Sequence, residues 1–164
     1  MTPEALGMAE PGVLRADLAA GPVSARHARA ALRQALATWG MDDPSGDAEL
    51  LASELVANAA EHTGSQQIGF VLRRHTGRDG RRGVTCEVTD TSPILPRPRL
   101  ASASDERGRG LAIVTALAAT SGVRAEASGK TTWFTLTLTG HAAATCPAAR
   151  RQPGANPKPG PDHL

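Results

Sequence analysis

The apolar residues of this chain recur at helical spacing in two long segments and cluster or alternate, as in β-strands, in several shorter ones. Turn signals rich in Gly, Pro and Asp separate these segments. The predicted elements are, in chain order, a strand at 13–19, helices at 23–39 and 47–62, strands at 67–74 and 83–90, a helix from 108–110 to 120, and strands at 122–127 and 131–139. This order predicts an α/β two-layer sandwich, with helices on one face of a mixed, mostly antiparallel sheet of four or five strands.

The length of 164 residues fits a single domain. We expect residues 1–10 to form a flexible leader, residues 11–140 the domain, and residues 141–164, rich in Ala, Pro, Arg and Gly, a disordered tail. Residues 91–107 contain three prolines and several serines and are expected to form a loop. A loop of that length favours a functional lid over a simple connection.

Composition narrows the classes of function. The formal net charge is only +2 and the chain has just two Trp, two Phe and no Tyr, so direct binding of nucleic acid is not expected. Cys86 and Cys146 form no metal-binding pair and are expected to be reduced thiols. Neither a signal peptide nor a membrane-spanning segment is visible, which predicts a cytoplasmic protein without membrane contact. Arginines around 73–82 are expected to form a solvated edge, or alternatively to meet an acidic partner.

The second predicted helix carries an unusual polar stripe. Glu54, Asn58 and His62 follow one another at intervals of four residues and therefore share one face. Asn is a poor helix former in mid-helix, because its side chain competes for backbone groups. Its amide oxygen can bind Mg²⁺, and a carboxylate one turn away can orient or deprotonate an attacking hydroxyl. A solvated helix face is the alternative interpretation.

Two further motifs are weaker when each is taken alone. Asp90 ends a predicted strand, where its carboxylate could accept a hydrogen bond from the amine of adenine, or could simply open the following turn. Gly108-Arg109-Gly110-Leu111 precedes an apolar helix. Glycines there let the backbone approach a ligand, and the helix N-terminus favours phosphate. The spacing matches neither a P-loop nor a dinucleotide-binding fingerprint.

The order of these motifs resembles the histidine-kinase-like (GHKL) ATPase family, over residues 10–140. The likeness is greatest to its small bacterial branch, the anti-sigma factor serine/threonine kinases. It implies ATP and Mg²⁺ as cofactors. It implies the following roles: Glu54 as catalytic base, Asn58 as Mg²⁺ ligand, Asp90 as adenine acceptor, Gly108, Gly110 and Leu111 on the phosphate side, and Thr131 behind the adenine.

The resemblance also implies a function and partners. The chain would transfer the γ-phosphate of ATP to a partner protein, and would control transcription through a sigma factor, an anti-anti-sigma protein, or both. A non-catalytic ATP-binding interaction module is the alternative, and Glu54 favours the enzyme because such a module would not need a base. The sequence leaves the oligomeric state open, with a homodimer as one expectation.

Overall fold

The computed structural model describes residues 7–62, 64, 66–92 and 109–138. Six strands form one sheet in the order β1-β2-β3-β4-β6-β5, and every neighbouring pair is antiparallel. The strands are β1 (Gly7–Glu10), β2 (Val13–Ala19), β3 (Gln67–Thr76), β4 (Arg82–Asp90), β5 (Thr120–Glu126) and β6 (Gly129–Thr137). The helices are α1 (Ser24–Thr38), α2 (Asp47–His62) and α3 (Arg109–Leu117).

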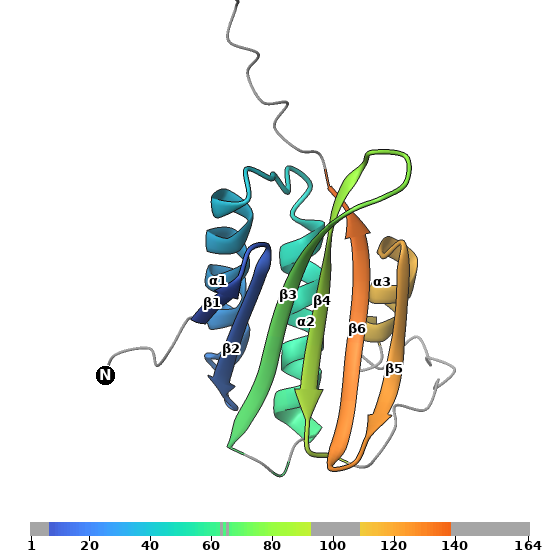
Figure 1. Cartoon of the computed structure of the whole chain (residues 1–164). Coiled ribbons are helices and arrows are strands. Elements are labelled where there is room, and N and C mark those ends of the chain that lie inside the picture. The colour runs from blue at the N-terminus through green and yellow to red at the C-terminus, as the bar shows by residue number, and fades with distance from the viewer. Residues whose placement is uncertain (1–6, 63, 65, 93–108, 139–164) are drawn as a thin grey trace, which may run out of the picture.

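The three helices lie side by side on one face of the sheet, with α2 between α1 and α3 (Figure 1). The predicted two-layer sandwich with helices on one face is therefore confirmed. Two details differ from the prediction, since the described sheet contains no parallel pair and has six strands. The hairpins β3–β4 and β5–β6 need only short turns, which accounts for the antiparallel pairing within each of them.

Alternation along the strands decides which side chains meet the helices. On β4, Val84, Cys86 and Val88 are buried in the core, and Asp90 continues this series by two. On β6, Phe134 and Leu136 belong to the same core and lie directly opposite Cys86 and Val84. Helix α2 contributes its buried stripe to this core, namely Ala48, Leu51, Ala52, Leu55, Val56 and Ala59. The opposite side of the sheet, here called the outer face, carries the intervening residues.

The N-terminus of α2 is fixed by local polar contacts. The backbone N–H of Glu49 donates to the Asp43 carboxylate at 3.1 Å, which satisfies one of the N–H groups left free at a helix start. Asp47 and Glu49 also place negative charge at the positive end of the helix. The predicted bounds of this helix, 47–62, match the structure.

Some boundaries differ from those that the sequence predicts. Strand β1 lies within the stretch expected to be a flexible leader, and it pairs with β2 through the turn at Pro11-Gly12. Strand β5 begins at Thr120, two residues before the predicted start. Most of the expected lid, residues 93–107, and the expected tail, residues 141–164, lie outside the described residues.

Candidate functional site

Helix α2 presents Glu54 and Asn58 on the side away from α1. The opposite flank is defined by Glu49, which forms an ion pair with Arg33 of α1 at 2.8 Å. Asn58 follows Glu49 by nine residues and so lies about 180° around the helix, while Glu54 lies about 140° around it. Because α3 is the neighbour of α2 on that side (Figure 1), both side chains belong to the α2–α3 flank.

The two polar groups on this flank are available for a ligand. Both residues are half-buried in the structure. Within the described ranges, neither the Asn58 amide nor the Glu54 carboxylate takes part in a hydrogen bond or ion pair. A solvated face would be more exposed, and a structural Asn in mid-helix would be expected to have a partner. Their free oxygen atoms fit the chemistry of a Mg²⁺ ligand and a proton acceptor.

Asp90 lies at the end of β4 on the helix-facing side, where it is only 4% exposed. Its Oδ1 atom accepts hydrogen bonds from the backbone N–H of Ser92 at 2.8 Å and from Nζ of Lys130 at 3.1 Å. The hydrogen bond from Ser92 closes a turn of the kind predicted for an Asp at a strand end, so the interpretation that Asp90 opens the following turn is correct. This turn does not exclude a hydrogen bond from the amine of adenine to Asp90, because a carboxylate has about four acceptor positions.

Gly129 allows the close contact between the ends of β4 and β6. A Cβ atom at this position would overlap the carbonyl oxygen of Asp90 and would lie 2.7 Å from the Cα atom of Thr91. Only a residue without a side chain can therefore bring Lys130, its neighbour, into register with Asp90.

Thr131 is not where the resemblance predicts it. Its hydroxyl hydrogen-bonds that of Thr89 at 2.8 Å on the outer face, away from the helices. The pKa of Glu126 is held below its usual range, mainly by a hydrogen bond from Arg124 and next by one from Thr131. The Thr131 hydroxyl therefore lies beside a second residue of the outer face. The expectation that Thr131 lies behind the adenine is therefore wrong, because strand alternation turns it to the other side of the sheet.

Lys130 and Thr132 occupy the helix-facing positions of this strand instead. Lys130 lies opposite Asp90, and Thr132 lies opposite Val88 in the core series. Sequence reasoning missed both residues. The signal was present, since Phe134 and Leu136 are the obvious core residues of the strand and an interval of two leads back to Thr132 and Lys130.

The phosphate-side residues are only partly described. Gly110 and Leu111 lie in the first turn of α3, as predicted for a glycine-containing helix start. Gly108 lies outside the described residues. Helix α3 packs against α2, so its N-terminal turn belongs to the same helix layer as Asn58.

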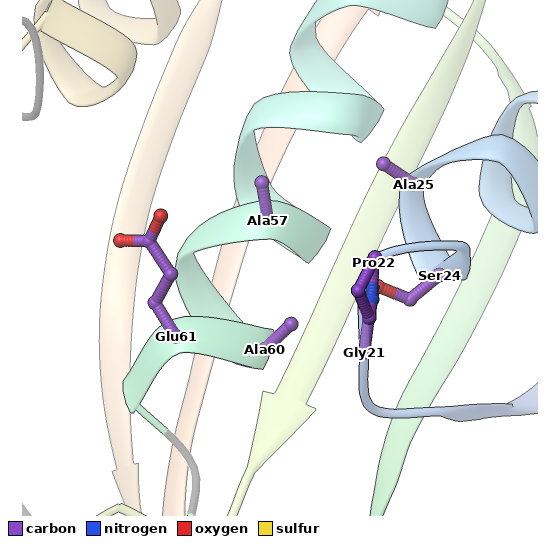
Figure 2. A pocket seen from close by; sticks show the side chains of 7 residues that line it. All are labelled: Gly21, Pro22, Ser24, Ala25, Ala57, Ala60 and Glu61. Carbon is purple, nitrogen blue, oxygen red and sulfur yellow. The ribbon is translucent and has the colours of Figure 1, made fainter.

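A separate pocket of about 330 Å³ lies between α2 and the turn that leads into α1. Figure 2 shows Ala57 and Ala60 of α2 facing Pro22 and Ala25 across it. Ala60 lies about 160° around the helix from Asn58. The walls consist mainly of Gly, Pro and Ala and include no cation for a triphosphate, and none of the predicted site residues lines this pocket.

No three His, Cys, Asp or Glu side chains among the described residues gather in a way that could hold a metal ion by themselves. The part of the site that the structure describes thus has no all-protein metal cage. This is compatible with Mg²⁺, which often retains waters and shares its coordination between one or two protein oxygens and substrate phosphates.

The family model of the histidine kinase-like ATPase domain matches residues 18–136, which include the α2 stripe, Asp90 and the start of α3. The chain belongs to this family. A search of curated proteins found no match. The histidine kinase-like ATPase domain is consistent with ATP binding, and none of its described helices is long and apolar enough to cross a membrane.

Proposed function

We propose that this domain binds ATP with Mg²⁺ between α2, the end of β4 and the start of α3, and transfers the γ-phosphate to a serine or threonine of a partner protein. The observation that carries the proposal is the α2–α3 flank. Half-buried Glu54 and Asn58 are spaced by one helical turn and have no hydrogen-bond partner within the described part of the chain. Their position within a histidine kinase-like ATPase domain gives this arrangement a nucleotide as its natural ligand.

In this proposal Asn58 supplies the amide oxygen that binds Mg²⁺, and the metal, when bound, neutralises phosphate charge. Asp90 accepts a hydrogen bond from the exocyclic amine of adenine. The backbone N–H groups around Gly108, Gly110 and Leu111 bind the phosphates at the N-terminal end of α3. This division of roles is supported by the placement of Asn58 in the helix layer and of Asp90 on the helix-facing side of the sheet.

Glu54 is the proposed proton acceptor. It precedes Asn58 by one turn on the same face, so a hydroxyl approaching a phosphate near Asn58 would meet the Glu54 carboxylate. Phosphoryl transfer depends mainly on positioning and on charge neutralisation, and a base adds to this by accepting the hydroxyl proton.

The resemblance to anti-sigma factor kinases suggests the partner. We propose that the phosphate acceptor is an anti-anti-sigma protein and that the domain also binds a sigma factor, in the cytoplasm and with a homodimer as one oligomeric state. The second candidate is a non-catalytic ATP-binding interaction module. The half-buried carboxylate of Glu54, which has no partner among the described residues, favours the kinase, since an interaction module has no use for such a base.

Transfer of radiolabelled phosphate from ATP to a panel of candidate anti-anti-sigma proteins tests the kinase proposal. Glu54→Gln keeps the size of the side chain and removes its charge. We expect it to retain ATP binding and to slow transfer by about 10²–10⁴-fold.

Glu49→Gln is the matched control, because it makes the same change on the same helix at a residue bound to Arg33 of α1. It should transfer phosphate like the wild type. Full transfer by the Glu54→Gln variant would contradict the role of Glu54. ATP binding by the wild type without transfer to any panel member would favour the interaction module.

A further inference from the structure

A buried ion pair joins the ends of β4 and β6 inside the helix-facing layer. Lys130 lies directly opposite Asp90 in the strand register, and the two side chains are 7% and 2% exposed. The Nζ atom of Lys130 lies 3.1 Å from Oδ1 of Asp90. Burial of two charges is costly unless further hydrogen bonds satisfy their remaining donors and acceptors.

Contacts among the described residues use only part of the hydrogen-bonding capacity of this pair. Oδ1 of Asp90 accepts hydrogen bonds from the ammonium of Lys130 and from the N–H of Ser92, and both contacts fall on this oxygen, so that among the described residues the lone pairs of Oδ2 are the larger remaining acceptor. An ammonium has three N–H donors. Within the described residues, Lys130 uses one of them, on Asp90. The pair therefore combines an acceptor and a donor next to each other at the adjoining ends of β4 and β6.

We propose that Lys130 reads the purine base together with Asp90, by donating a hydrogen bond to N1 of adenine while Asp90 accepts one from the adenine amine. This inference rests on the proposed nucleotide site and adds a specificity-determining residue to it. An acceptor beside a donor complements the edge of adenine, where the amine donor neighbours the N1 acceptor.

The same arrangement opposes guanine. In the same position, guanine would place its carbonyl oxygen against the Asp90 carboxylate and its N1–H against the Lys130 ammonium. Both contacts would be mismatched, because each would join two acceptors or two donors within a buried site. Asp90 alone could reject only the carbonyl group. Lys130 would add a second mismatch, against the N1–H of guanine, and so increase the preference for ATP over GTP.

Calorimetric titration of the full chain with ATP, GTP and 1-deaza-ATP in Mg²⁺ tests the inference. The 1-deaza analogue keeps the amine and replaces N1 by C–H, so it removes only the acceptor assigned to Lys130. We expect the wild type to bind it about tenfold or more weakly than ATP, as for the loss of a hydrogen bond to a charged group. Equal affinities for ATP and 1-deaza-ATP would overturn the inference.

Lys130→Met identifies the residue responsible. This variant should bind ATP and 1-deaza-ATP equally, and its preference for ATP over GTP should fall by about tenfold or more. If this variant still bound 1-deaza-ATP as much more weakly than ATP as the wild type does, another group would contact N1 and the proposal would be overturned. If Lys130→Met does not fold, Lys130→Gln replaces it, since its amide keeps a polar contact with Asp90 but ends one atom short. For Lys130→Gln, the ratio of the affinity for ATP to the affinity for 1-deaza-ATP should be at least about threefold smaller than in the wild type. An unchanged ratio would overturn the proposal.

Arg124→Met is the matched control, because it removes a cation from the outer face beside β6 and should leave all three affinities unchanged. The two proposals fail separately in this design. A wild-type chain that does not bind ATP at all would contradict the proposed function. Binding of ATP without discrimination at N1 would contradict only the role of Lys130.

Discussion

Single residues on β6 show how far sequence reasoning reaches into the site. The family resemblance assigned the adenine side to Thr131, whereas the strand register turns Thr131 outward and Thr132 inward. Two adjacent threonines are equivalent in a motif, but on a strand they lie on opposite faces. The positions of Asp90, Glu54 and Asn58 on their elements could be predicted because the apolar patterns of these elements are unambiguous, while the roles of the three residues stay predictions. Lys130 could not be paired with Asp90 from sequence, since register between distant strands depends on the whole sheet.

The two threonines provide a prediction at this scale. Thr132→Val keeps the shape of the side chain and removes a hydroxyl on the helix-facing side, where we propose that the nucleotide binds, so we expect ATP affinity to fall about two- to tenfold. Thr131→Val removes the outer-face bond to Thr89 and should leave ATP affinity unchanged. Calorimetric titration of both variants measures the difference. The reverse pattern would restore the original assignment of Thr131.

At the level of elements, the hairpin arginines illustrate a different limit. The sequence suggested a solvated edge or a surface for an acidic partner. The structure instead gives Arg82 a helix-capping role, because its guanidinium donates to the carbonyl groups of Trp39 and Gly40 just beyond α1. Arg73 forms an ion pair with Glu87, and Arg81 forms one with Asp79. Composition alone could not distinguish a free cation from one that satisfies a distant helix end.

Removal of this cap should weaken the domain. We expect Arg82→Ala to lower the free energy of unfolding by about 1–2 kcal/mol, since hydrogen bonds from a charged donor to the carbonyl groups after α1 are lost. Arg78→Ala, at an exposed position of the same hairpin, should change it by less than about 0.5 kcal/mol. Urea unfolding followed by circular dichroism measures both. Equal destabilisation by the two variants would show that the cap contributes nothing specific.

Element boundaries were predictable where local and tertiary signals agree. Helix α2 and strand β2 have their predicted bounds, because turn residues and caps coincide with the ends of their apolar patterns. Strand β1 was missed, since the segment Gly7–Glu10 has no strand-like alternation of its own and gains its structure by pairing with β2. Tertiary pairing of this kind is not encoded in local propensity.

For the molecule as a whole, a sheet covered on one face explains both the core and the outer face. The core contains mainly aliphatic residues from α1, α2 and the helix-facing strand positions. The outer face carries an ion-pair network in which Glu87 contacts both Arg73 and Arg124. Cys86, one position before Glu87, points into the core and is fully buried. Burial raises the pKa of the Cys86 thiol, and the neighbouring Glu87 carboxylate adds to the shift.

This burial predicts the reactivity of the cysteine. Thiol reagents attack the thiolate, so Cys86 should be inert in the folded domain and should react only after unfolding. In a Cys146→Ser variant, which leaves Cys86 as the sole cysteine, we expect labelling at neutral pH to be slowed by at least about 10²-fold relative to the protein in urea. The time course of reaction with a chromogenic disulfide measures this ratio. Rapid labelling under native conditions would show that the core opens readily around β4.

The central claim is that Asn58 holds the metal of a bound Mg²⁺–ATP, and calorimetric titration with ATP in Mg²⁺ and in chelator tests it most directly. Asn58→Ala should fold, because Ala is a better helix former, and its ATP affinity in Mg²⁺ should fall to the value that the wild type shows in chelator. Ser53→Ala, a polar-to-alanine change on the α1 side of the same helix, should bind like the wild type. A folded Asn58→Ala domain that binds ATP in Mg²⁺ as tightly as the wild type would contradict the account.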